Sequence, residues 1–410
     1  MKRYAILLLV VMLLFQFAAC GKQEPSMDAL SDLTPIPPSE PPKPAEKPIE
    51  PAPEAVPEKT EQDDMQEPTD EPEAVPEPEQ ETETEIEPEP EPEQKNAWTL
   101  CFAGDCTIGT LHEWQGQHSS NNMLYVIGDD YAYPFSGVSG IFDAADFTMV
   151  NLEGTFTNET AAKGKDYRFR SAPDYAAVLP LGNVDAVTLA NNHSGDYLNA
   201  GLADTKAALE ENGILWADDH TPLIVELEGG LKLGFVTYNV VEIDLYVGDV
   251  DGYMAHITPQ YNQCVEAACD LIIGFMHWGW EYTDGPEDWM VDFAHRMADM
   301  GFDMVVGSHA HILQETEYYN GVPIFYSLGN FCYGGHSNPK DKDTVIVRQN
   351  LVLSEDGTVI LGETEFLPCS ISSDPNSNNF CPTPYQESDA AWNRILGKLH
   401  AEEFYTGYEQ

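Results

Sequence analysis

Residues 302–314 read FDMVVGSHAHILQ, in which a short apolar run leads into two histidines that stand two positions apart. Side chains at positions i and i+2 of an extended chain point to the same face, so the rings of His309 and His311 can converge on one object. We expect that object to be a metal ion, because neutral imidazole is a common metal ligand. A pair of solvated loop histidines is the alternative that this stretch alone leaves open.

The same arrangement recurs along the chain: an apolar run of strand length ends in polar residues. The runs are 98–103, 147–150, 185–190, 271–276 and 302–306, and the polar residues after them include Asp105, Glu153, Asn192 with His193, His277, and the histidine pair. Helical patterns at 198–214 and 287–301 separate some of these runs and stop at glycines. In α/β sheets, ligands bind beyond the carboxyl ends of the strands. The pattern therefore predicts an α/β fold whose oxygen and nitrogen donors suit a divalent transition metal.

The first twenty residues are typical of an export signal. Lys2 and Arg3 precede a short apolar run, and small residues lead up to Cys20. The ending FAAC followed by Gly21 resembles a bacterial lipobox, which implies that Cys20 is lipidated. An ordinary secretory signal is the alternative. We expect residues 1–20 to be a lipoprotein signal peptide.

Residues 21–96 are predicted to be a disordered tether rich in Glu and Pro. They contain 24 Asp and Glu residues against five Lys. Low hydrophobicity and high charge cannot offset the entropy that ordering costs, and repeated X-Pro pairs favour extended chain. We expect the tether to hold the rest of the protein away from the extracytoplasmic face of the cell membrane, where a lipid on Cys20 would anchor it.

Residues 97–410 have an ordinary globular composition but a strongly acidic balance, with 46 Asp and Glu against 12 Lys and Arg. Such a surface disfavours nucleic acid as a partner, because binding to phosphate chains needs basic patches. It would also repel a polyanionic substrate unless cations intervene. We expect a main domain over 97–370 and a C-terminal extension over 371–410 that packs on it.

Seven blocks, in this order between about 99 and 333, carry a family resemblance: FAGDCTIG, NLEGTFT, FRSAP, TLANNHSGDY, MHWGWEY, GSHAHILQ and YSLGNF. As a set they resemble the signature blocks of the CapA family of poly-γ-glutamate capsule synthesis and retention proteins, which are related to calcineurin-like metallophosphoesterases. The resemblance implies a four-layer αββα sandwich with a metal site at one edge of its central sheets.

Carried over residue by residue, the resemblance implies which side chains hold the metal. They are Asp105, Glu153, Asn192, His277, His309 and His311, and the ion implied is Mn, Fe or Zn. The phosphoesterase pattern has a histidine where this chain has Thr107, so one half of a two-metal centre has a ligand fewer. A second departure is Leu198, which stands where the family usually carries glycine.

Four further residues are candidates for catalysis or substrate binding. His193 is placed to protonate a leaving group, and Asp196 either orients that ring or caps the following helix. Arg170, in a local concentration of basic residues at 163–170, offers an arginine fork for carboxylate or phosphate. Asn330 follows another apolar run and is expected to line the same edge.

The leading hypothesis for function is a surface-anchored lipoprotein of capsule or poly-γ-glutamate biosynthesis or export, with a metal-dependent hydrolase or transferase site. Its expected partners are an anionic polymer such as poly-γ-glutamate, the membrane, and membrane subunits of a capsule synthase. Two alternatives remain: a polyanion-binding export scaffold without catalysis, and a phosphoesterase that acts on cell-wall or nucleotide phosphates. The absence of a histidine at position 107 weakens the phosphoesterase hypothesis most.

Overall fold

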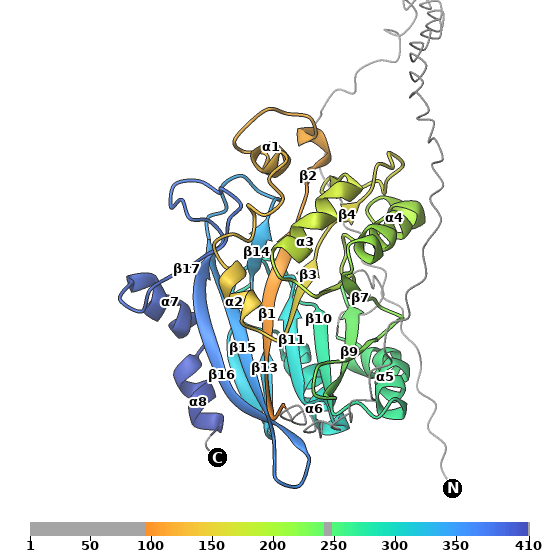
Figure 1. The fold of residues 1–410 in the computed structure, drawn as a ribbon, viewed down its shortest axis with the longest axis vertical. Coiled ribbons are helices and arrows are strands. Elements are labelled where there is room, and N and C mark those ends of the chain that lie inside the picture. The colour runs from red at the N-terminus through yellow and green to blue at the C-terminus, as the bar shows by residue number, and fades with distance from the viewer. Residues whose placement is uncertain (1–94, 242–247, 409–410) are drawn as a thin grey trace, which may run out of the picture. The chain divides into compact units, whose positions relative to one another are not determined.

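The computed structural model describes residues 95–241 and 248–408. Two large mixed sheets lie face to face at the centre of this part of the chain (Figure 1). The first sheet has the order β17 (Thr383–Pro384), β16 (Val359–Ser370), β15 (Asp343–Leu353), β1 (Ala97–Thr107), β3 (Phe147–Leu152), β6 (Ala186–Thr188) and β7 (Leu215–Ala217), with β14 (Asn330–Tyr333) also paired to β1. The second has the order β12 (Thr316–Tyr319), β13 (Val322–Phe325), β11 (Met304–Ser308), β10 (Leu271–His277), β9 (Lys232–Asn239) and β8 (Leu223–Glu226). A small third sheet joins β2 (Thr110–Leu111), β5 (Phe169–Ser171) and β4 (Thr155–Phe156).

Helices cover the outer face of each large sheet. The first sheet carries α1 (Met123–Ile127), α2 (Ser139–Asp143), α3 (Val178–Leu181) and α4 (Leu198–Glu211), and the second carries α5 (Val250–Glu266) and α6 (Asp288–Met300). Short 3₁₀ helices span His112–Trp114 and Pro173–Ala177. The predicted four-layer αββα sandwich is therefore confirmed. The two helices predicted at 198–214 and 287–301 are α4 and α6, and Gly301 ends α6 with a φ of 113°.

Strand β1 shows why the central strands are apolar almost throughout. Leu100 and Phe102 face the core between the sheets, whereas Cys101 and Ala103 face the helices on the outer side, and all four are fully buried. Alternation on a strand that is covered on both faces leaves no position for a polar side chain. Across the inner core, the ring centroid of Phe235 lies 5.3 Å from that of Phe147 and 6.4 Å from that of Phe102.

The C-terminal helices α7 (Ala390–Lys398) and α8 (Ala401–Tyr408) pack on the side of the sandwich. Phe404 of α8 has its ring centroid 5.2 Å from that of Phe366 on β16 and 5.7 Å from that of Phe325 on β13, so it contacts both sheets. The expected signal peptide, Cys20 and nearly all of the tether lie outside the described residues. Among the described helices, none combines the length and the apolar character needed to cross a membrane.

An aspartate directly precedes each of four parallel strands and makes two hydrogen bonds to a residue near the start of the neighbouring strand. Its backbone N–H donates to a carbonyl of that neighbour, and its carboxylate accepts the N–H of the same residue. The four pairs are Asp146 with Thr99, Asp185 with Thr148, Asp270 with Lys232, and Asp303 with Ile272. The N–H groups at this edge have no strand partner, so the carboxylates satisfy them.

Asp303 makes this edge sensitive to pH. Burial raises the pKa of Asp303 to about 6, although the N–H of Ile272 favours the charged form. Because an unfolded aspartate titrates near 3.8, the unfolded chain releases its proton first and stability falls as pH rises from about 4 to 6. Asp303→Asn, which keeps an oxygen acceptor, should be more stable than the wild type by about 1–2 kcal/mol at pH 7.5. The difference should vanish near pH 4.

Urea unfolding of both proteins at the two pH values measures this difference. A constant difference between pH 4 and 7.5 would contradict the predicted titration. Asp270→Asn is the matched control, since its carboxylate accepts the same kind of bond from Lys232 at a more exposed position.

Residues 326–329 cross from the second sheet, where β13 ends, to the first, where β14 begins. Two glycines make room for this crossing. A Cβ on Gly104 would lie 1.9 Å from the carbonyl oxygen of Gly329, and a Cβ on Gly307 would lie 2.1 Å from that of Tyr326. Gly104 directly precedes Asp105, and Gly307 lies two residues before His309, so the crossing segment is held at the same edge of the sandwich as the polar residues.

Candidate metal centre

The carboxyl ends of the parallel strands in both sheets bring a set of buried polar side chains together. Asp105 lies near the end of β1 and Glu153 just after β3, while His277 is the last residue of β10. His309 and His311 follow β11. All five are buried, although the sequence separates the first from the last by about two hundred residues.

The distances within this cluster are short. The Nδ1 atom of His311 is 3.4 Å from Oδ2 of Asp105, and Nε2 of His277 is 3.7 Å from Oε1 of Glu153. The rings of His277 and His309 have their centroids 4.7 Å apart. Ligand atoms of Glu153, His309 and His311 all lie within 4.8 Å of one another, which is close enough for one ion to contact all three.

Asn192 completes the set of six predicted ligands. Its Oδ1 atom is 2.9 Å from Nε2 of His277. The structure thus places all six in one cluster, and their role as metal ligands stays a prediction. Thr107, which stands where the phosphoesterase pattern has histidine, points its hydroxyl at Oε2 of Glu153 over 3.5 Å.

Within the described residues, two buried atoms of the cluster have no hydrogen-bond partner. They are Oε1 of Glu153 and Nδ1 of His309. A buried polar atom without a partner costs about 1–3 kcal/mol, so such atoms call for an explanation. A divalent cation contacted by a carboxylate oxygen and imidazole nitrogens would supply the missing partner for both atoms. The residues present therefore fit a divalent metal, and nitrogen with oxygen donors is the set that Mn, Fe and Zn accept.

The electrostatics of the cluster favour a bound positive charge. Burial raises the pKa of Glu153 to about 8. Burial alone would lower the pKa of His311, but Glu153 and Asp105 outweigh it and raise that pKa to about 10. Each shift favours the protonated form of its own group, and the rise at His311 requires the negative charge of Glu153 and Asp105, so a metal ion would have to displace the proton that this pair holds. His309, in contrast, has its pKa lowered to about 3, first by burial and then by the charge of His311, so its ring stays neutral and can ligate.

The histidine pair does not converge in the way that an extended strand would dictate. Strand β11 ends at Ser308, and the backbone then turns with φ values of 91° at His309 and 58° at His311. The premise of an extended chain at these residues is therefore wrong. Left-handed conformations of non-glycine residues cost about 1–3 kcal/mol and persist only where the surroundings impose them. Here they hold both rings at the cluster, with centroids 6.0 Å apart.

His193 and Asp196 lie beside the cluster. Nδ1 of His193 is 2.9 Å from Oδ2 of Asp196, and Nε2 faces Glu153 at 4.0 Å from its Oε1 atom. Asp196 also accepts the N–H of Phe169, so it fixes the ring relative to β5. Of the two roles that the sequence allowed, this geometry matches orientation of the ring, since helix α4 begins at Leu198 after Tyr197 without a side-chain cap.

Arg170 and Asn330, the two predicted substrate-binding residues, differ in their surroundings. Arg170 hydrogen-bonds to Gln115 and to the carbonyl of Glu159, and its guanidinium lies 4.9 Å from the ring centroid of Tyr197. These three contacts are with other parts of the protein, and none of them is with the cluster. Asn330, in contrast, accepts at Oδ1 from Nδ1 of His311 over 2.9 Å and donates to the carbonyl of the same residue.

Sequence reasoning missed three residues that contact the cluster or the His193–Asp196 pair beside it. Asn151 donates to Oδ1 of Asp105 and lies 3.2 Å from Nδ1 of His277, to which the hydroxyl of Ser308 is also bonded. The ammonium group of Lys165 is 2.6 Å from Oδ1 of Asp196 and 3.3 Å from Nδ1 of His193. Asn151 and Ser308 stand at strand ends, so the rule that selected the six predicted ligands also applied to them.

The residues of this cluster come from the seven sequence blocks between about 99 and 333, and one family model covers all of these blocks. The model for the bacterial capsule synthesis protein PGA_cap matches residues 99–334. The chain belongs to this family. The match contains all six predicted ligands, and it confirms the resemblance to CapA proteins that the sequence blocks carried.

Curated relatives of this PGA_cap chain come from several bacteria. The chain is 27% identical over 280 residues to the PGA biosynthesis protein CapA of Bacillus subtilis (65% of this chain, 70% of the relative). It is 26% identical over 253 residues to the capsule biosynthesis protein CapA of Bacillus anthracis (57% and 60%). A probable polyglutamine synthesis accessory protein of Mycobacterium tuberculosis is 31% identical over 241 residues (51% and 63%). The chain thus spans less than two thirds of the latter two proteins.

Solved structures with a related arrangement are more distant. The NAD nucleotidase of Haemophilus influenzae aligns with a TM-score of 0.37 at 12% identity, over 75% of this chain and 67% of that one. The 5′-nucleotidase of Candida albicans aligns with a TM-score of 0.39 at 12% identity, over 75% and 58%. Scores of this size carry no argument about function.

Leu198, which stands where the resemblance led us to expect glycine, has a left-handed backbone with a φ of 59°. Its side chain is 44% exposed, so it packs little. Leu198→Gly should stabilise the protein by up to about 1 kcal/mol, because glycine adopts positive φ without the steric cost of a Cβ. Denaturant unfolding measures the change. Leu202→Gly, further along the same helix, is the control and should destabilise by about 1 kcal/mol or more; loss of stability in both variants would refute the strain at Leu198.

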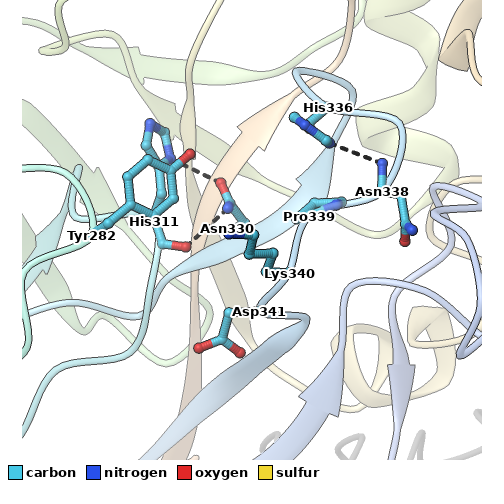
Figure 2. Close-up of a pocket in the computed structure, with 8 residues that line it drawn as sticks. All are labelled: Tyr282, His311, Asn330, His336, Asn338, Pro339, Lys340 and Asp341. Carbon is cyan, nitrogen blue, oxygen red and sulfur yellow. Dashed lines mark hydrogen bonds between the residues drawn. The ribbon is translucent and has the colours of Figure 1, made fainter.

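A cavity of about 470 Å³ opens beside the cluster. Figure 2 shows Tyr282, His311 and Asn330 on one side of it and the loop of His336 and Asn338 on the other, with Lys340 between them. The rings of Tyr282 and His311 have their centroids 5.9 Å apart. The cavity therefore gives a substrate-sized molecule access to a face of the cluster.

Proposed function

We propose that this PGA_cap-family protein acts in capsule or poly-γ-glutamate biosynthesis or export through a metal-dependent hydrolase or transferase site. The single observation that carries the proposal is the buried donor cluster in which Glu153 Oε1 and His309 Nδ1 lack partners. Family membership and the printed names of the relatives support the polymer as substrate. We further propose that Cys20 is lipidated, which would anchor the protein on the extracytoplasmic face of the cell membrane next to the membrane subunits of a capsule synthase.

Within this proposal, Asp105, Glu153, Asn192, His277, His309 and His311 hold the ion. A divalent metal in such a site lowers the pKa of bound water and neutralises charge that develops on an acyl or phosphoryl group. Asn151 and Ser308 orient His277 through its Nδ1 atom. Asn330 orients His311 in the same way, and such outer contacts fix the rings in the position needed for ligation.

His193 moves a proton at Nε2. Burial lowers the pKa of His193, although Asp196 acts in the opposite direction, so the ring is neutral at pH 7. Because Nδ1 donates to Asp196, the free electron pair is on Nε2, which faces Glu153. The neutral ring therefore takes up a proton before it can give one to a leaving group. Lys165 pairs with Asp196 and compensates the buried carboxylate.

Metal analysis and two assays on the purified full chain test the proposal. We expect a stoichiometric divalent metal, and release of γ-glutamyl units or transfer of polymer that stops when the metal is chelated. A phosphate ester such as a nucleotide is the second assay substrate. Bound metal with turnover of phosphate esters alone would favour the phosphoesterase hypothesis. Polymer binding without any turnover would favour the export scaffold.

A further inference from the structure

A second hollow, of about 620 Å³, adjoins the cavity beside the cluster. Residues 338–341 line both, so the two share one wall. The first hollow reaches His311 and Asn330, whereas the second continues to Tyr385 and to helix α7. Together they form a path along the surface that begins at the candidate metal centre.

This path concentrates positive charge in an otherwise acidic domain. Residues 97–410 contain 12 Lys and Arg. Four of them line the second hollow: Lys340, Lys342, Arg394 and Lys398. Only two acidic residues line it, Asp341 and Asp343. The lining therefore carries a net positive charge, although the domain as a whole carries many more acidic than basic residues.

The two aspartates hold two of the four cations in place. Arg394 donates to both oxygens of Asp343 over 2.8 and 2.6 Å, and Lys398 lies 2.7 Å from Asp341 and 2.8 Å from Asp343. These pairs fix the side chains of Arg394 and Lys398 before any ligand arrives, which lowers the entropy that binding costs.

No carboxylate lies within ion-pair distance of the other two cations in the described residues, although Lys342 interacts with Asp374 through its charge. Lys340 is exposed and lines both hollows, and its side chain makes no hydrogen bond or ion pair with any residue that the structure describes. Lys342 donates to the carbonyl oxygen of Pro375 over 2.9 Å, so its charge is not neutralised by that contact. Both ammonium groups are therefore available to an anion from outside the protein.

We propose that the second hollow is a subsite for a polycarboxylate chain, and that Lys340 and Lys342 bind the carboxylates next to the unit that reaches the metal cluster. This inference rests on the proposed function, because it takes the acidic polymer as substrate. A chain with a carboxylate on every unit matches a path of spaced cations. Elsewhere the acidic surface repels such a chain, so the path also selects the direction in which the polymer lies.

Binding of γ-glutamyl oligomers to the full chain tests the subsite. A single γ-glutamyl unit and an oligomer of about twelve units are titrated at constant ionic strength. The wild type should bind the oligomer more tightly. Lys340→Gln/Lys342→Gln should bind it about tenfold more weakly, with binding of the single unit unchanged, since two charge contacts are lost. The matched control is Lys232→Gln/Arg296→Gln, which removes two charges on the other side of the fold and should change neither affinity more than twofold.

The outcomes separate this inference from the proposed function. A double lysine variant that binds the oligomer as the wild type does would overturn the subsite. Displacement of the oligomer by inorganic phosphate at equal charge would reveal a simple phosphate site and would also overturn it. His309→Ala/His311→Ala should keep the contribution of the two lysines to binding even if the protein turns over no polymer. If the metal-loaded wild type itself turns over no polymer while the two lysines still contribute to its binding, the subsite stands and the catalytic proposal fails.

Discussion

Replacing His309 and His311 together by alanine should remove the divalent metal that we expect the purified wild type to contain. The two imidazoles and Glu153 form the group whose ligand atoms lie within 4.8 Å of one another, so the variant retains only one of its three members. Metal analysis of the dialysed protein measures the loss, which should be complete. Binding to the folded state adds stability by mass action, so a chelator should lower the melting temperature of the wild type but leave that of the variant unchanged.

The control for this experiment removes two histidines that lie away from the cluster. His118 stacks on Tyr125, and His295 pairs with Glu317 and stacks on Tyr319. His118→Ala/His295→Ala should keep the full metal content. A folded His309→Ala/His311→Ala protein with wild-type metal content would show that GSHAHILQ is not a ligand motif, and the binding scaffold would then become the better account.

Replacing His193 by alanine should abolish most turnover and leave the metal bound. The residue faces Glu153 through Nε2 but is not among the predicted ligands. Proton transfer by a positioned side chain contributes about 10²–10⁴-fold, and we expect a loss of that size in kcat on whichever substrate the metal-loaded wild type turns over. Steady-state kinetics combined with metal analysis separates this effect from loss of the ion.

Asp196→Asn tests whether orientation of His193 matters. The amide keeps the size of the side chain but can present its NH₂ group to Nδ1, which would favour the wrong tautomer of the ring. This variant should lose kcat in the same direction with little change in KM. Turnover in His193→Ala equal to that of the wild type would exclude the proton-transfer role.

Much of the sandwich was predictable because apolar runs and their polar ends are local signals. Asp105 and His277 were predicted as ligands because each follows an apolar run, and in the structure both lie within the last residues of their strands and not after them. A further signal was present but unused: an aspartate directly before four strands, as in Asp185 and Asp303. It marks the amino ends of the strands as clearly as the histidines mark the carboxyl ends.

The remaining features depend on contacts that no local pattern specifies. Arg170 hydrogen-bonds to Gln115, which lies in a segment without secondary-structure periodicity. The sequence therefore does not distinguish an arginine that binds substrate from one whose guanidinium is bonded to another part of the protein. The left-handed backbone at His309 depends on tertiary surroundings that override the preference of the residue. The crossing of residues 326–329 between the sheets also requires knowledge of which strand belongs to which sheet.

The position of β1 determines when the first sheet can form during synthesis of the chain. This first strand of the domain lies between β3 and β15, and Phe102 pairs with Val347. At about 10 residues per second the ribosome needs roughly 20 s to make β15, the second partner of β1, after it has made β3, the first. During that time one edge of an apolar strand has no partner, and pairings so distant in sequence form slowly. A nascent chain of this protein should therefore depend on a holding chaperone, and truncation before β15 should send it to proteolysis.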